Sequence, residues 1–139
     1  MKGEPCGRKC QICLEKPGAC KSRGVVYEIH CKVCKDKGLK SLYIGETHRT
    51  LWDRTSEHLS KLESRAKDSA LFKHWRTVHP ENHQEPEFIV KKVGAYLSST
   101  ERQIREAIRI DMAQYDHLMN SKGEWERQKL TRIGFFDNT

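Results

Sequence analysis

Cysteine and histidine side chains at metal-ligand spacing are the most specific chemical signal in this chain of 139 residues. Two residues separate Cys31 from Cys34, and four separate His74 from His79. Structural Zn²⁺ takes four such ligands in a closed tetrahedron. We therefore expect a Cys2His2 zinc site, with His83 as the alternative to His79. Surface histidines and free thiols are the competing interpretation.

Four more cysteines near the N-terminus form a second candidate metal cluster. Gaps of three, two and six residues separate Cys6, Cys10, Cys13 and Cys20. The segment 1–23 has neither helical nor strand periodicity and no core of its own, so metal binding would have to order it. Disulfides are the alternative, which a nuclear or cytosolic redox environment disfavours. We predict a second zinc site with four cysteine ligands in this extension.

Three short apolar or alternating segments predict the strands of a small sheet. They cover residues 24–30, 41–45 and 88–96, and the turn-like stretch 31–40 would form a hairpin with a long loop. Gly94 would mark a bulge in the third strand. We expect an α+β fold, in which a three-stranded antiparallel sheet is flanked by helices.

Two predicted helices follow the second strand. Thr47 or Thr50 would cap the first, which runs to Leu62. Ser69 would begin the second, and Pro80 would end it. Each helix carries apolar residues at helical spacing and so has one face to bury.

A third predicted helix covers residues 99–115, where Ser98 and Glu101 form a capping box. Its apolar residues share one face: Ile104, Ile108, Met112 and Tyr115. The chain then divides into a Cys-rich extension, a main domain and a tail that packs on this domain: residues 1–23, 24–121 and 122–139.

The net charge of +7 is concentrated at one end of the chain. Residues 1–40 carry ten Lys and Arg against four Asp and Glu, whereas residues 41–139 carry sixteen against fifteen. A basic end on a nearly neutral body indicates a polyanionic partner such as nucleic acid, or else a solvated basic arm. With a mean hydropathy of −0.81 and no apolar run of membrane-span length, we expect no membrane partner. No secretory signal is evident, so we expect a nuclear or intracellular protein that is not secreted.

Several short motifs, in this order, resemble the GIY-YIG nucleases. They are VVY (25–27), YIG (43–45), RTSEH with Arg54 and His58, REAIRI around Glu106, and LMN ending at Asn120. The first motif departs from the family pattern but keeps its tyrosine. The resemblance implies the family's nuclease fold and hydrolysis of a DNA phosphodiester with one divalent cation, Mg²⁺ or Mn²⁺.

The resemblance implies catalytic roles for Tyr27, Tyr43, Arg54, His58, Glu106 and Asn120. The guanidinium of Arg54 suits the charge of an attacked phosphodiester, and Glu106 would bind the divalent cation. Tyr27 is the leading general base, while Tyr43 would orient water or phosphate. His58 is the alternative base, because an imidazole titrates closer to neutral pH. Asn120 would support the site through hydrogen bonds.

A narrower resemblance is to the endonuclease domains of Penelope-like retroelements. The Cys-Cys-His-His insertion and the stretches ETHRTL, SALFKHW and REAIRI are similar to that group. This resemblance implies a nickase module beside a reverse transcriptase in one polyprotein, which leaves a 3′-hydroxyl for extension. The expected DNA contacts are Lys9, Lys21, Arg23, Lys40, His48 and Arg49.

Ordinary structural roles are the alternative for each of these residues. The two tyrosines would then be core residues of the strands, and Arg54 would pair with Glu57 on a solvated helix face. Glu106 would pair with Arg102 or Arg109 on an exposed face. At the level of function, the alternatives are a zinc-stabilised module that binds nucleic acid without cutting it, and a repair or junction-resolving nuclease.

Overall fold

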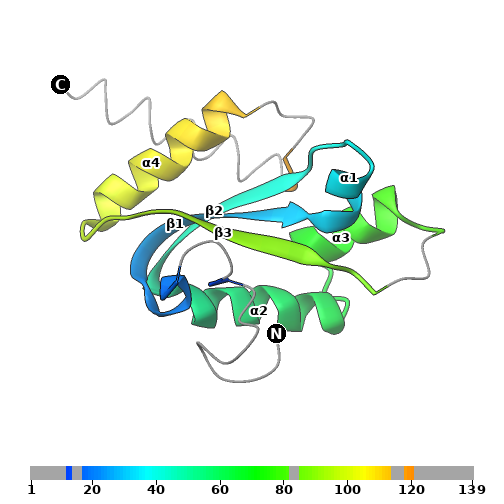
Figure 1. Cartoon of the computed structure of the whole chain (residues 1–139), viewed down its shortest axis with the longest axis horizontal. Coiled ribbons are helices and arrows are strands. Elements are labelled where there is room, and N and C mark those ends of the chain that lie inside the picture. Colours follow the sequence, from blue (N-terminus) through cyan, green and yellow to red (C-terminus); the bar gives the residue numbers. More distant parts are fainter. Residues whose placement is uncertain (1–11, 14–16, 82–84, 114–117, 121–139) are drawn as a thin grey trace.

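A three-stranded antiparallel sheet with the order β2-β1-β3 is the centre of the computed structural model (Figure 1). Its strands are β1 (Arg23–Cys31), β2 (Leu42–Thr50) and β3 (Phe88–Ala95). The helices are η1 (Ala19–Lys21), α1 (Lys32–Asp36), α2 (Leu51–Glu63), α3 (Ala70–Val78) and α4 (Ser99–Met112). The residues that the structure describes are 12–13, 17–81, 85–113 and 118–120. The predicted α+β fold with helices flanking the sheet is confirmed.

One face of the sheet packs against α2 and α3. Tyr27 and Ile29 of β1 point to this face, where they join the main core with Leu51 of α2 and Leu71 of α3. All four side chains are almost completely buried. This layer therefore holds α2 and the start of α3 directly over the central strand.

The opposite face of the sheet packs against α4. Leu42 and Ile44 of β2 form a smaller apolar cluster with Ile110 of α4. Because side chains alternate along a strand, the neighbours of Tyr27 and Tyr43 point to this second face. Figure 1 shows α4 and α2 on opposite sides of the strands.

The predicted helix caps are confirmed. Each hydroxyl accepts a hydrogen bond from the backbone N–H three residues further on, at 3.1, 3.1 and 3.3 Å: Thr50 from Asp53, Ser69 from Phe72, and Ser98 from Glu101. These bonds satisfy N–H groups that have no partner within the helix. They also fix where α2, α3 and α4 begin.

Two parts of the fold differ from the prediction. The second strand continues five residues past the predicted end, to Thr50, because its polar residues still pair with β1 as far as Arg23. Within the predicted loop 31–40, the residues after Cys31 form the short helix α1. The polar composition indicated turns at both places. Backbone hydrogen bonds form a strand at the first and a helix at the second.

The buried face of α4 is not its apolar stripe. Met112 is 79% exposed, whereas Arg102, Glu106 and Ile110 are buried. The sheet presents the Glu46 carboxylate to this helix, so Arg102 turns inward to meet it, whereas Arg109 bonds Glu28 from an exposed position. A search for apolar spacing cannot find a helix face that is attached by ion pairs.

Gly45 leaves space for the Tyr27 ring. The two residues are paired across β1 and β2. A Cβ on Gly45 would lie 2.5 Å from both Cζ and Oη of Tyr27, which is far inside van der Waals contact. The glycine of the YIG motif therefore lets a tyrosine from the central strand lie across the edge strand.

We expect Gly45→Ala to lower the free energy of unfolding by on the order of 2 kcal/mol, because the added methyl group overlaps the Tyr27 ring. Denaturant unfolding measures this loss. A double-mutant cycle with Tyr27→Ala is the control, since removing the ring should abolish most of the penalty. Equal penalties with and without the ring would contradict the close approach.

Candidate active site and metal centre

Tyr27 and His58 are joined by a buried hydrogen bond. The Tyr27 hydroxyl lies 2.8 Å from Nε2 of His58. Burial, reinforced by the charges of Arg54 and Lys61, lowers the pKa of His58 to about 3. The imidazole is therefore neutral at neutral pH, and in the tautomer that carries its proton on Nδ1 the hydroxyl donates and Nε2 accepts.

Tyr43 completes an aromatic group around His58. Its ring centroid lies 4.9 Å from that of His58 in an edge-to-face arrangement, and 6.4 Å from that of Tyr27. Tyr27 is fully buried, and Tyr43 is 7% exposed. The two strands and α2 thus bring three of the predicted catalytic side chains together.

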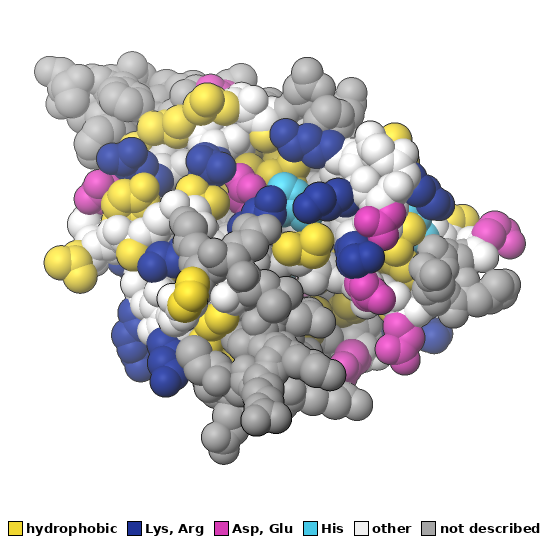
Figure 2. All heavy atoms as spheres, in the orientation of Figure 1, with side chains coloured by type: hydrophobic (Ala, Val, Ile, Leu, Met, Phe, Trp, Pro, Cys, Tyr) yellow, Lys and Arg dark blue, Asp and Glu magenta, His cyan; other side chains and the backbone are white. Residues whose placement is uncertain are grey.

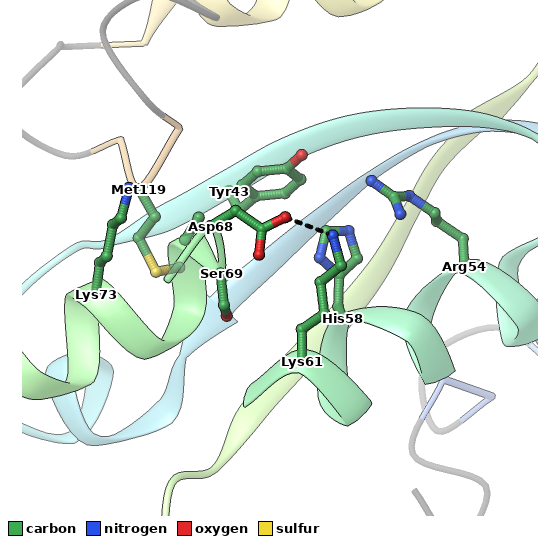
Figure 3. Close-up of a pocket in the computed structure, with 9 residues that line it drawn as sticks. Tyr43, Arg54, His58, Lys61, Asp68, Ser69, Lys73 and Met119 are labelled. Atoms are coloured by element: carbon green, nitrogen blue, oxygen red, sulfur yellow. Dashed lines mark hydrogen bonds and ion pairs between the residues drawn. The ribbon is translucent and has the colours of Figure 1, made fainter. Parts of the chain in front are cut away.

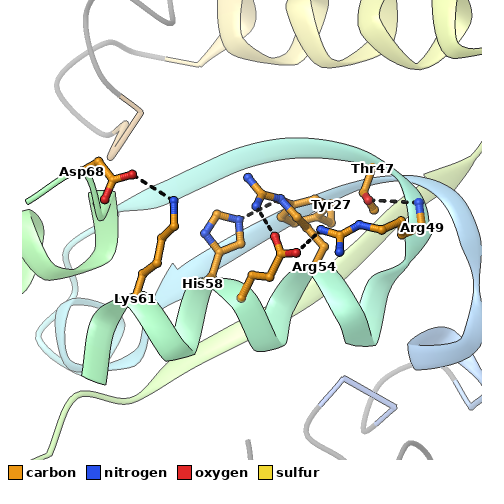
Figure 4. Close-up of polar contacts among 8 residues, drawn as sticks. Tyr27, Thr47, Arg49, Arg54, His58, Lys61 and Asp68 are labelled. Carbon is orange, nitrogen blue, oxygen red and sulfur yellow. Dashed lines mark hydrogen bonds and ion pairs between the residues drawn. The ribbon is translucent and has the colours of Figure 1, made fainter. Parts of the chain in front are cut away.

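Arg54 lies one helical turn before His58 and shares its face of α2. Its Nη1 donates to Glu57 at 2.9 Å, and Glu57 also pairs with Arg49 (Figure 4). Burial lowers the pKa of Arg54, but the neighbouring Tyr27 and Glu57 more than offset this effect, so the pKa is raised. The predicted ion pair with Glu57 exists, and the half-buried guanidinium also lies beside the tyrosines.

A pocket of about 190 Å³ opens beside this group (Figure 3). Tyr43, Arg54 and His58 line one part of it. The rest is lined by residues that were not predicted as site residues: Lys61, Asp68, Ser69, Ala70, Lys73 and Met119. For Lys61 a signal existed, because it is three residues after His58 and seven after Arg54, on one helical face.

Glu106 lies on the other face of the sheet. It is buried, one turn after Arg102 and one turn before Ile110, on the side of α4 that covers β2. The predicted alternative of an exposed helix face is wrong. Arg102 bonds Glu46 at 3.1 Å and Arg109 bonds Glu28 at 2.7 Å. The structure therefore does not bring Glu106 to the face that carries Tyr27 and His58.

Asn120 binds the outer edge of β2. Its Oδ1 accepts from the N–H of Ile44 at 2.9 Å, and its Nδ2 donates to the carbonyl of the same residue at 2.8 Å. Leu118 forms a parallel bridge with Leu42 beside it. The side chain thus acts as a backbone mimic that continues the sheet, which supports the strand that carries Tyr43.

The Cys31, Cys34, His74 and His79 side chains lie together between α1, β1 and the end of α3. Their ligand atoms all lie within 4.8 Å of one another, with Sγ–Nε2 distances of 3.2 to 3.4 Å. In a tetrahedral zinc site with ordinary bond lengths, the distance between a sulfur ligand and a nitrogen ligand is about 3.5 Å. The donor set and its geometry therefore fit a structural metal ion.

Burial governs the metal-free protonation of this cluster. It raises the pKa of Cys31 to about 11 and lowers the pKa of His74 to about 4. Nδ1 of His79 is buried and has no hydrogen-bond partner among the described residues. Without a metal ion, these side chains contribute little to the stability of the fold. A bound cation would hold them together through the deprotonated thiols.

The predicted DNA contacts fall into two groups. Arg23 is paired with Thr50, so Lys21, Arg23 and Arg49 lie at the end of the sheet where α2 begins, while Lys40 precedes β2 at the other end. His48, like Lys21, Arg23 and Lys40, is exposed. Figure 2 shows Lys and Arg side chains spread over one face, with Asp and Glu among them.

Some predicted site residues lie outside the described part of the chain: Lys9, Cys6, Cys10 and His83. Of the predicted four-cysteine site, Cys13 and Cys20 are described, and Cys20 is buried in the main core with Ile12 and Ala19. The tail 122–139 and the beginning of the extension are likewise outside it. These predictions stay untested.

Comparisons of the chain with protein-family models, curated protein sequences and solved structures gave no match. Among the described residues, no helix has both the length and the apolar character needed to cross a membrane. Any statement about function therefore depends on the geometry of the site itself.

We expect the chain to bind zinc through the Cys31–His79 cluster, and zinc at about 1,000 times its Kd to raise the free energy of unfolding by about 4 kcal/mol. Cys34→Ser and His79→Ala should each abolish that gain. His48→Ala, at an exposed histidine, is the control. Thermal unfolding with and without a chelator measures the difference, and the same gain in all three variants would contradict this site.

We expect acid to destabilise the zinc-bound protein through His58. Its pKa in the folded protein is about 3, below the ordinary value of 6.5. Between these two pH values, His58 is protonated in the unfolded chain and neutral in the folded protein. The free energy of unfolding should fall by up to about 1.4 kcal/mol per pH unit from this group. His58→Gln should flatten the profile. Denaturant unfolding between pH 7 and pH 4 measures both slopes.

Proposed function

We propose that the chain is a divalent-metal-dependent DNA endonuclease of the GIY-YIG type, which nicks one strand and leaves a 3′-hydroxyl. The observation that carries this proposal is that Tyr43, Arg54 and His58 line one pocket. Tyr27 is hydrogen-bonded to His58 directly behind this lining. Core tyrosines and surface arginines are common. A buried tyrosine bonded to a neutral histidine beside a charged guanidinium is an arrangement suited to proton transfer next to an anion.

Tyr27 and His58 act in series in this mechanism. The Tyr27 oxygen takes a proton from the attacking water as its own proton passes to Nε2 of His58 along the 2.8 Å hydrogen bond. His58 resists protonation because it is buried next to the charge of Arg54. A bound phosphodiester anion offsets that charge, which favours proton transfer when substrate is present.

Arg54 stabilises the charge that develops on the phosphate. The ion pair with Glu57 holds its guanidinium from one side, and Glu57 is itself held by Arg49. A planar group fixed in this way presents its remaining N–H donors to phosphate oxygens without having to reorganise. Tyr43, at the wall of the pocket, orients the water or the phosphate.

A divalent cation such as Mg²⁺, held by the Glu106 carboxylate, would offset charge on the leaving oxygen. Glu106 and Tyr27 are on opposite faces of the sheet, but α2 and α4 both pack against β2. The proposal therefore requires the phosphodiester to lie at the outer edge of β2. This requirement makes Glu106 the residue whose substitution tests the mechanism most severely.

The zinc centre has a structural role in this proposal, because its ligands tie α1 to the end of α3. A second zinc ion in residues 1–23 would order basic residues next to Lys21 and Arg23. By the resemblance to Penelope-like endonucleases, a reverse transcriptase in the same polyprotein would extend the nick, in the nucleus or elsewhere inside the cell. The basic excess of residues 1–40 supports a DNA partner.

We expect the zinc-loaded protein to convert supercoiled plasmid to open circles in Mg²⁺. Arg54→Ala, Tyr27→Phe and Glu106→Gln should each slow nicking by a factor of about 100 or more. Glu101→Gln, at an exposed carboxylate on the same helix, should nick at the wild-type rate. Gel electrophoresis of the plasmid gives all five rates.

Other outcomes point to the alternative functions. DNA binding without nicking, by a folded wild-type protein, would contradict the nuclease proposal and favour a non-cleaving module. Faster cutting of branched DNA than of plain duplex would favour a repair or junction-resolving nuclease. Loss of nicking in Arg54→Ala but not in Glu106→Gln would leave the nuclease proposal intact and overturn the role of Glu106 in binding the metal.

A further inference from the structure

The pocket extends beyond the residues that the proposed chemistry uses. From Tyr43, Arg54 and His58 it continues to the end of α2 and the beginning of α3, where Lys61 and Lys73 line it (Figure 3). Neither lysine takes part in the mechanism above. The pocket is thus larger than a site for one phosphate group requires.

The lining carries a positive charge. Arg54, Lys61 and Lys73 are cationic, His58 is neutral, and Asp68 is the one carboxylate among the described lining residues. Lys61 bonds Asp68 at 2.9 Å, but both side chains are about half exposed or more, so this ion pair is weak. For the Lys73 ammonium, the described residues include no hydrogen-bond or ion-pair partner. An anion would therefore be attracted to the α3 end of the pocket.

We propose that this end of the pocket binds a second phosphodiester of the same DNA strand, next to the one that is cut, through Lys73 and Lys61. The inference rests on the proposed function for the identity of the ligand. The strand would run from Arg54 past Tyr43 to Lys73. Asp68 opposes this binding by pairing with Lys61. Removing Lys73 should therefore weaken DNA binding, and neutralising Asp68 should strengthen it.

Binding of a fluorescent 24-bp DNA duplex to the zinc-loaded protein, with Ca²⁺ in place of Mg²⁺, tests the proposal without cleavage. Lys73→Ala should raise Kd by a factor of about 5 to 10 and lower the salt slope by about one ion. Lys67→Ala is the matched control, because this exposed lysine precedes Asp68 without lining the pocket. Asp68→Asn should lower Kd by a factor of about 2 to 4.

Neutral methylphosphonate linkages, introduced one at a time, locate the contact. One linkage should weaken wild-type binding by about the same factor as Lys73→Ala and leave the Lys73→Ala variant unaffected. With a cleavable substrate, this linkage should adjoin the cut. Equal Kd values for Lys73→Ala and Lys67→Ala, or losses that add at every linkage, would overturn the proposal.

Together, the nicking assay and the binding experiments distinguish failure of the nuclease function from failure of the second phosphate contact. Nicking that persists with no coupling at any linkage refutes only the second phosphate contact. Absence of nicking refutes the nuclease function, and coupling at one linkage would then still assign the pocket to a DNA phosphodiester.

Discussion

The candidate active site depends on a buried hydroxyl that needs a partner. The Tyr27 ring extends over Gly45 into the layer between the sheet and α2, where leaving its oxygen without a hydrogen-bond partner would be costly. Nε2 of His58 supplies that partner at 2.8 Å. This hydrogen bond and the packing of Leu51 in the core together orient α2 on the sheet, and the positions of Arg54 and Lys61 on the same helix follow from that orientation.

The electrostatics of the site follow from the same burial. His58 stays neutral because desolvation and the charge of Arg54 both oppose its protonation. Arg54 stays charged because a guanidinium keeps its proton at ordinary pH, and Tyr27 and Glu57 offset the effect of its burial. A neutral acceptor and a permanent cation thus lie side by side, and burial keeps the imidazole neutral in acid, where an exposed histidine would be charged.

How far the sequence predicts this structure differs between elements. Caps at Thr50, Ser69 and Ser98 are local signals, so the starts of the helices were predictable. The inward face of α4 was not, since Arg102 is buried by a partner, Glu46, that comes from β2. The place of Lys73 was not predictable for the same reason, because only the return of α3 beside α2 brings it to the pocket that Lys61 lines.

The two hydrogen bonds from Asn120 to Ile44 have a consequence for solubility. An edge strand with open N–H and C=O groups is a template for pairing with another chain. At Ile44 those groups are already taken by the Asn120 amide, and at Leu42 the carbonyl accepts a hydrogen bond from the N–H of Met119, beside the bridge to Leu118. A chain truncated before Leu118 would present this part of β2 to other molecules, and self-association would compete with folding.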